Sequence, residues 1–165
     1  MAELEAEIAQ LLREYQAETG KLLTIGAVES ATGGRIADRI TNVPGSSDYF
    51  KGSLVAYSNE VKITLLGVKK ETIEGYGAVS EQTALEMAQG GRKLLGVDVC
   101  ISDTGIAGPS GATSEKPVGL FYIGLATEHE SLSQEHVFRG NREGNKRDAA
   151  EAALNILKQY LLRCT

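Results

Sequence analysis

The chain has 165 residues with a formal net charge of −5, and 42% of the residues are hydrophobic. This length suits one domain with a substantial core, so we expect a single domain over residues 1–165. An acidic chain with no basic run is a poor nucleic-acid binder, and no apolar run reaches the roughly 18 residues that a membrane span needs. Two cysteines cannot form a disulfide framework. We therefore expect a soluble, cytoplasmic protein that binds neither nucleic acid nor a membrane.

Helical periodicity opens the chain. Apolar residues recur at helical spacing from Leu4 to Tyr15, and Gly20 stands where a C-terminal cap belongs. The apolar run over residues 22–28 predicts a short buried strand. Residues 35–40 follow a run of small residues and predict a helix.

The middle of the chain repeats the same order of strand and helix. Residues 53–57 predict a second strand, and Ser58 or Asn59 is suited to cap a helix that Gly67 ends. A longer amphipathic helix is expected from Ser80 onwards.

A third strand over residues 97–102 leads into a glycine-rich loop, and strands near 118–126 and 132–138 predict an antiparallel hairpin. The last segment, from about residue 142, has one apolar helical face. We therefore predict an α/β fold with a mixed β-sheet of about five to six strands packed by helices, a C-terminal β-hairpin and a long C-terminal helix.

Two glycine-rich loops follow predicted strands, and ligands in open α/β sheets bind at such strand ends. In the first loop, residues 29–34, small residues leave backbone N–H groups free to face an anion at a helix start. The N–H groups of residues 32–34 are the expected oxyanion donors. The spacing matches neither the P-loop nor the dinucleotide fingerprint, and an ordinary tight turn is the alternative.

The second loop contains Asp103 in an Asp-Thr-Gly string. An aspartic protease would need a second copy on an all-β fold, so we interpret Asp103 as a carboxylate that braces the loop. His129 and His136 lie in or beside the predicted hairpin turn and are expected to be exposed, and Cys100 is expected to be an inert core thiol. These patterns alone predict a small anionic ligand and no metal site.

Five strings resemble, in order and spacing, the C-terminal domain of the CinA family, also found as a stand-alone nicotinamide-nucleotide amidase. They occupy residues 28–34, 55–62, 77–80, 104–109 and 115–119. The resemblance implies that the chain hydrolyses the carboxamide of nicotinamide mononucleotide to nicotinic acid mononucleotide and ammonia. It also implies a small-molecule nucleotide substrate, no cofactor or metal, and a homodimer or larger homo-oligomer.

Within the resemblance, Ser30 corresponds to the nucleophile, Lys62 to the base and Thr104 to a hydroxyl that lines the site. The residues that we assign to substrate binding are Thr32, Gly33, Gly34, Tyr57, Gly105 and Arg142. A serine hydroxyl needs an adjacent base, and a lysine acts as one only when its ammonium is desolvated. Lowering a lysine pKa by about 3 units costs on the order of 4 kcal/mol.

Two positions depart from the family pattern. Ala31 stands where the family usually has cysteine, and Asn141 where it usually has aspartate, so neither of those side-chain roles carries over. Retention of Ser30, Lys62 and Thr104 favours an amidase. The alternative is a nucleotide-binding or regulatory module with the same pocket and little turnover.

Overall fold

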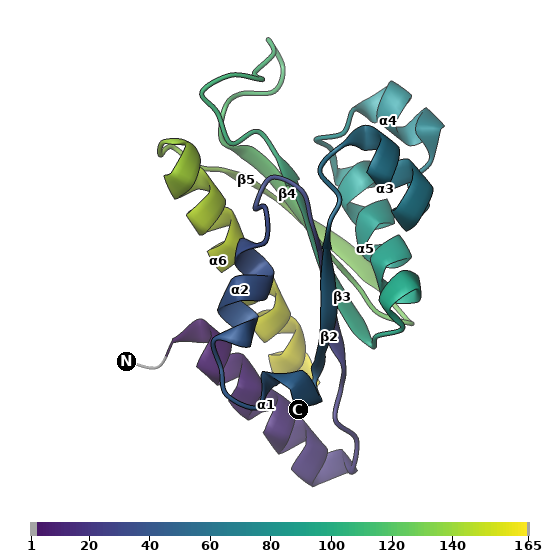
Figure 1. The fold of residues 1–165 in the computed structure, drawn as a ribbon, viewed down its shortest axis with the longest axis vertical. Helices are drawn as coiled ribbons and strands as arrows, with labels where there is room; N and C mark the ends of the chain where they lie inside the picture. Colours follow the sequence, from purple (N-terminus) through teal and green to yellow (C-terminus); the bar gives the residue numbers. More distant parts are fainter. Residues whose placement is uncertain (1–2, 165) are drawn as a thin grey trace.

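A five-stranded mixed sheet forms the centre of the computed structural model, which describes residues 3–164 (Figure 1). The strands are β1 (Ile25–Glu29), β2 (Phe50–Val55), β3 (Val99–Gly105), β4 (Leu120–Ala126) and β5 (Ser131–Val137). Their order is β2-β1-β3-β4-β5. β1 pairs in parallel with β2 and β3, whereas β4 is antiparallel to both β3 and β5. The predicted fold class, with its C-terminal hairpin, is confirmed.

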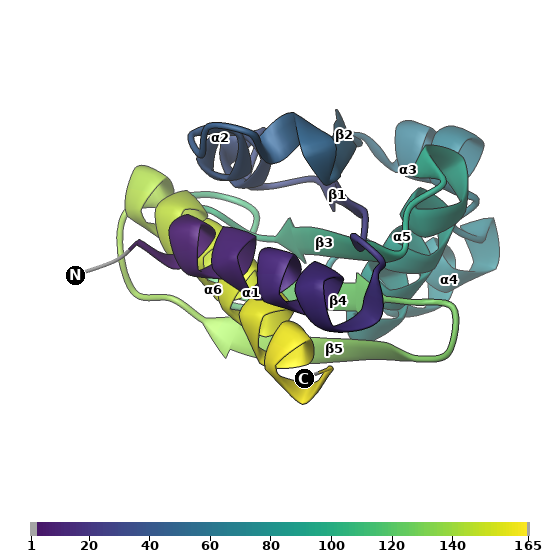
Figure 2. The ribbon, with the colours of Figure 1, turned by 90° about the horizontal axis from the view of Figure 1, so that it is seen from below.

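Helices cover both faces of the sheet, as Figure 2 shows from below. One face carries α1 (Leu4–Thr19), α2 (Arg35–Thr41) and α6 (Arg142–Arg163). The other carries α3 (Asn59–Leu66), α4 (Lys70–Tyr76) and α5 (Glu81–Leu95), while a short 3-10 turn (Ser46–Asp48) precedes β2. Within residues 3–164, no helix is both long enough and apolar enough to cross a bilayer.

The alternation of side chains along the central strands builds two hydrophobic clusters. Ile25 and Ile101 belong to the larger cluster, which includes residues of α1, α2 and α6. Val28 and Cys100 belong to the smaller cluster, together with Met87 of α5. Because successive side chains of a strand point to opposite faces, the two helical layers are each held by hydrophobic burial.

Several helices begin or end at the capping residues that the sequence predicted. Gly20 ends α1 in the left-handed conformation, with φ of 81°. The Ser58 hydroxyl accepts the N–H of Val61 at the start of α3, and Gly67 ends that helix. Ser80 caps α5 by accepting the N–H of Thr83.

Strand bounds differ from the predicted ranges by a few residues. β1 begins at Ile25 rather than at residue 22, because the N–H of Thr24 donates to Asp98 outside the sheet. β3 continues to Gly105, inside the predicted loop, because Gly105 pairs with Phe121 of β4.

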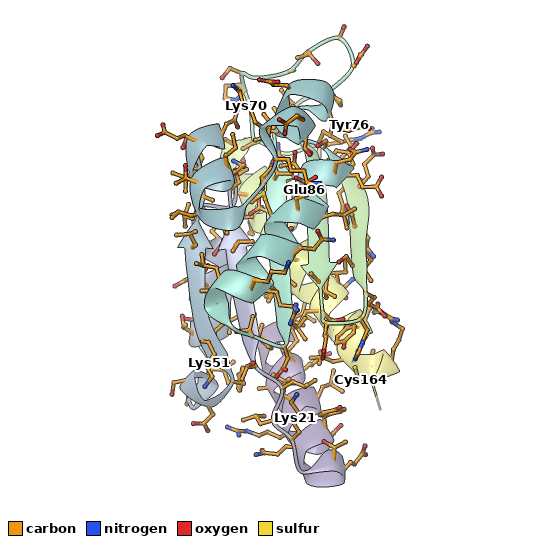
Figure 3. The ribbon with its side chains drawn as sticks, turned by 90° about the vertical axis from the view of Figure 1, so that its right-hand side faces the viewer. Lys21, Lys51, Lys70, Tyr76, Glu86 and Cys164 are labelled. Atoms are coloured by element: carbon orange, nitrogen blue, oxygen red, sulfur yellow. The ribbon has the colours of Figure 1, made fainter. Side chains whose placement is uncertain are left out.

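Helix α4 is absent from the sequence prediction. Its start is held from another element: Glu86 of α5 accepts the N–H of Lys69 at 2.8 Å and the hydroxyl of Thr72 at 2.7 Å. Figure 3 labels Glu86 where α5 faces α4. The capping group is therefore distant in sequence, and no local pattern indicates it.

Candidate active site

A cavity of about 320 Å³ lies where the parallel strands β1, β2 and β3 end. The first loop leaves β1 at Ser30, Tyr57 follows β2, and Thr104 stands at the end of β3. The cavity is lined by Ser30, Ala31, Tyr57, Asn59, Lys62, Ala78, Val79, Thr104–Ala107, Gly108, Ser110, Gly111 and Arg142. Six of the nine predicted site residues thus line one pocket.

One polar contact in this pocket joins the predicted base to the predicted nucleophile. Lys62 Nζ lies 2.9 Å from Ser30 Oγ. The same Nζ donates to the carbonyl oxygens of Ala56 at 2.9 Å and Tyr57 at 3.0 Å. These two carbonyls follow β2 and fix the amine against the hydroxyl.

Burial decides the character of this lysine. Lys62 is only 2% exposed although it lies on a short helix, so it is not a solvent-facing lysine. Desolvation lowers the pKa of Lys62 from its ordinary value, while the negative charge of Asp103 opposes that change by raising it. The amine is thus shifted towards the neutral form that a general base requires.

Asp103 braces the loop that carries the nucleophile, as the sequence predicted. Its carboxylate is fully buried and accepts the N–H of Ser30 at 2.9 Å and the N–H of Thr32 at 3.1 Å. Burial raises the pKa of Asp103 to about 6, although hydrogen bonds from Thr32 and Ser30 oppose the rise. This carboxyl therefore sets the position of the Ser30 backbone.

Glu29 is a second buried carboxylate that sequence reasoning did not single out. It accepts three backbone N–H groups at the start of α2, from Gly34 at 3.1 Å, Ile36 at 3.0 Å and Ala37 at 3.1 Å. The Ser53 hydroxyl adds a contact at 3.2 Å. These donors all reach the two carboxyl oxygens of Glu29, which therefore holds the start of α2 against the end of β1.

The expectation that the N–H groups of residues 32–34 face a ligand is wrong. The N–H of Thr32 donates to Asp103, that of Gly33 to the Ser30 carbonyl, and that of Gly34 to Glu29. Neither Thr32 nor the two glycines line the cavity. The left-handed φ values of Gly33 and Gly34, 62° and 104°, instead let the chain turn back over the carboxylates of Asp103 and Glu29.

The N–H of Ala31 is different from its neighbours. Ala31 lines the cavity, and within residues 3–164 no acceptor lies in hydrogen-bond reach of its N–H. It directly follows Ser30, the position from which a backbone N–H reaches the oxyanion in other serine hydrolases. The sequence indicates this N–H group only through the position of Ala31 directly after the nucleophile.

Thr104 and Gly105, at the end of β3, form another part of the cavity wall. The Thr104 hydroxyl donates to the Ala78 carbonyl at 2.7 Å, which leaves its oxygen as an acceptor towards the cavity. A β-carbon at Gly105 would lie within 2.6 Å of the Phe121 ring, so any larger residue at position 105 would force this ring to move.

Arg142 and Tyr57 form the exposed rim. One guanidinium nitrogen of Arg142 donates to the Gly108 carbonyl at 2.7 Å, and the other contacts the Tyr57 hydroxyl at 3.2 Å. Arg142 is the first residue of α6, where Asn141 acts as the cap by accepting the N–H of Gly144. The asparagine therefore has a capping role without a carboxylate.

Other candidates lie outside the pocket. Cys100 is fully buried, and desolvation raises the pKa of its thiol to about 12, as expected for an inert core residue. His129 is exposed in the hairpin turn, whereas His136 is half-buried on β5 and stacks on Phe138. Within residues 3–164, no group of three His, Cys, Asp or Glu side chains is placed to hold a metal ion.

Comparison with known proteins identifies the family of this chain. The model of the CinA C-terminal domain family matches residues 2–161. The chain belongs to this family. A CinA-like protein of Chloroherpeton thalassium is 48% identical over 162 residues, which cover 96% of this chain and 37% of that protein. One of Syntrophomonas wolfei is 51% identical over 145 residues, or 88% of this chain and 34% of that protein.

Solved structures show the same fold. A competence/damage inducible protein from Agrobacterium tumefaciens has a TM-score of 0.88 at 32% identity, with 98% of this chain and 97% of that chain covered. A competence damage-inducible protein from Klebsiella pneumoniae has a TM-score of 0.88 at 27% identity, covering 98% of each chain. The chain spans little over a third of the curated relatives' length, but nearly all of these solved chains.

Proposed function

We propose that this CinA-family chain is an amidohydrolase that converts nicotinamide mononucleotide to nicotinic acid mononucleotide and ammonia. One observation carries the proposal: a buried lysine amine, Lys62, lies 2.9 Å from the hydroxyl of Ser30 in an open pocket. A serine and a buried lysine form a known variant of the nucleophile–base pair for acyl transfer. The choice of nucleotide rests on the resemblance to the family.

The hydrogen bonds of Lys62 suit a base. The carbonyl oxygens of Ala56 and Tyr57 only accept, so they occupy two N–H groups of the amine. In the neutral amine, the remaining position is a lone pair directed at Ser30 Oγ, and the serine hydroxyl donates to it. This arrangement prepares the proton transfer that activates the hydroxyl.

The reaction then follows in two halves. Ser30 Oγ attacks the carboxamide carbon while Lys62 takes its proton, and the resulting oxyanion faces the N–H of Ala31. Lys62 returns the proton to the leaving nitrogen, the C–N bond breaks and ammonia departs. Lys62 then takes a proton from water while the water oxygen attacks the ester carbon, and it returns that proton to Ser30 Oγ as the C–O bond to Ser30 breaks and the carboxylic acid, which ionises, is released. The Thr104 oxygen is placed to accept an N–H of the carboxamide.

The rim supplies the nucleotide contacts in this proposal. Arg142 and Tyr57 lie at the open side of the cavity, where a phosphate remains partly hydrated. An arginine recognises phosphate with a charge-assisted and often bidentate contact. The nicotinamide ring would enter towards Ser30, with the phosphate at Arg142.

A regulatory, nucleotide-binding module is the second candidate, and one observation favours it. The three partners of Lys62 Nζ equally suit an ammonium that donates three hydrogen bonds. A lysine in that form braces the pocket without acting as a base. Such a module binds the nucleotide in calorimetry but releases no ammonia.

The test is turnover by the purified protein. Nicotinamide mononucleotide should yield ammonia and nicotinic acid mononucleotide in equal amounts, with kcat rising with pH as Lys62 loses its proton. Ser30→Ala and Lys62→Met should each lower kcat by about 10²–10⁴-fold. The double variant should be little slower than either single variant, because the pair acts as a unit. Exposed Ser47→Ala and Lys70→Ala are matched controls. Near-normal turnover by Ser30→Ala would refute the nucleophile.

A further inference from the structure

The loop beneath the nucleophile contains one hydroxyl between two carboxyl groups. Thr32 Oγ1 lies 2.5 Å from Asp103 Oδ1 and 2.6 Å from Glu29 Oε1. All three side chains are fully buried, so water does not separate them. A hydroxyl has one hydrogen and can donate to only one of the two oxygens. Two ionised carboxylates would therefore leave one oxygen pair in close contact without a proton.

The donor count indicates which carboxyl holds the additional proton. Glu29 Oε1 already accepts the N–H groups of Gly34 and Ile36 besides the Thr32 hydroxyl, which leaves no room for a proton on that oxygen. Asp103 Oδ1 accepts only one backbone N–H, that of Ser30. Glu29 also has the positive end of α2, a stabilisation that Asp103 lacks.

We propose that Asp103 is protonated in the resting protein and donates to Thr32 Oγ1, which in turn donates to Glu29, so that this buried cluster holds one negative charge and Lys62 stays neutral. In this series of hydrogen bonds, Asp103 donates to Thr32 and Thr32 donates to Glu29, so each hydroxyl hydrogen has one acceptor. Asp103 touches no substrate in this arrangement and is a positioning residue. The consequence for Lys62 as a base rests on the proposed function.

The electrostatics agree with this placement. Burial raises the pKa of Asp103 to about 6 even with the Thr32 hydroxyl turned towards it, and the charge of Glu29 raises it too. Turning that hydroxyl to Glu29 removes a stabilising bond from ionised Asp103, so its pKa rises further. Neutral Asp103 no longer raises the pKa of Lys62, and desolvation then lowers that pKa unopposed.

The other charged groups around the loop are few. Glu29 faces Asp103 from β1 and Lys62 faces it from α3. Lys146 of α6 lies against Gly33 on the outer side of the same loop. Lys146 favours a negative charge beneath the loop, and Glu29 already supplies one.

The test observes the two groups directly by NMR, without any activity. In protein labelled at the aspartate carboxyl carbon, the Asp103 signal, assigned by its loss in Asp103→Asn, should titrate with a midpoint above about pH 7, because the carboxyl is protonated in the resting protein. Glu29→Gln frees the Thr32 hydroxyl for Asp103, so the Asp103 midpoint should fall and the Lys62 amine should titrate at higher pH. Glu86→Gln, at the start of α4, removes a carboxylate elsewhere and should change neither.

The outcomes separate this inference from the proposed function. A midpoint for Asp103 below about pH 7 means that the carboxyl is ionised in the resting protein and overturns the inference even if the protein releases ammonia. The expected titrations in a protein without turnover uphold the inference and refute the amidase. If Glu29→Gln does not fold, the wild-type titration still decides, together with the pH dependence of unfolding. An acid with a raised pKa stabilises the fold at low pH, and that stabilisation is lost as pH rises through the folded-state value.

Discussion

Gly90→Ala, a substitution in α5, should reduce turnover by displacing α3, the helix that carries Lys62. Alanine is normally the better helix former by about 1 kcal/mol, so α5 alone would gain stability. However, a β-carbon at Gly90 would lie 2.7 Å from the carbonyl carbon of Leu66, the last residue of α3, and closer still to its oxygen. Carbon contacts are optimal at about 3.5–4.0 Å, so α3 must move by roughly 1 Å.

That movement reaches the site because Lys62 lies one turn before Leu66 on the same short helix. Its amine is 2.9 Å from Ser30 Oγ, and misplacing a reacting group by about 1 Å can cost 10²-fold in rate. We expect turnover to fall by about 10²-fold. Overpacking costs about 1–3 kcal/mol in a well-packed core, and each kcal/mol lowers Tm by about 2–4 °C in a domain of this size.

The assay pairs ammonia release with thermal unfolding, and Gly75→Ala is the matched control. Gly75 is also in a helix, α4, and a β-carbon there meets nothing within 4 Å. It should keep turnover and gain up to about 1 kcal/mol of stability. If Gly90→Ala behaves like Gly75→Ala in both measurements, the coupling between the α3–α5 contact and Lys62 does not exist.

Three further predictions concern the rim, the mechanism and the thiols. Arg142→Lys cannot contact both Gly108 and Tyr57, so KM should rise by about tenfold or more with little change in kcat; an unchanged KM would make Arg142 a helix-start residue only. Dialysis against a chelator should leave turnover intact, because Ser-Lys chemistry supplies its own nucleophile and base; loss of turnover restored by a divalent ion contradicts this. A thiol reagent should modify half-buried Cys164 in the native protein but Cys100 only after unfolding, and rapid native labelling of both would show that the core opens.

Local sequence patterns were sufficient to predict most of the helices and strands. Helical spacing and caps such as Gly20 and Ser58 act within a few residues, so the sequence alone determined α1, α3 and α5. Alternating order also determined the α/β class. Helix α4 has no such local signal, because its start depends on Glu86 from α5.

The same division applies to the site. Sequence strings give Ser30, Lys62 and Thr104 in order along the chain, and the resemblance pairs Lys62 with Ser30 as base and nucleophile, but the burial of Lys62 beside Ser30 is a property of the fold. That follows from parallel pairing of β1 with β2 and β3, which brings three strand ends to one edge of the sheet. The pairing also decides that Asp103 reaches the Ser30 loop, across 73 residues of chain. The N–H of Thr32 is likewise bonded only in the tertiary structure, because its acceptor Asp103 lies 71 residues away along the chain.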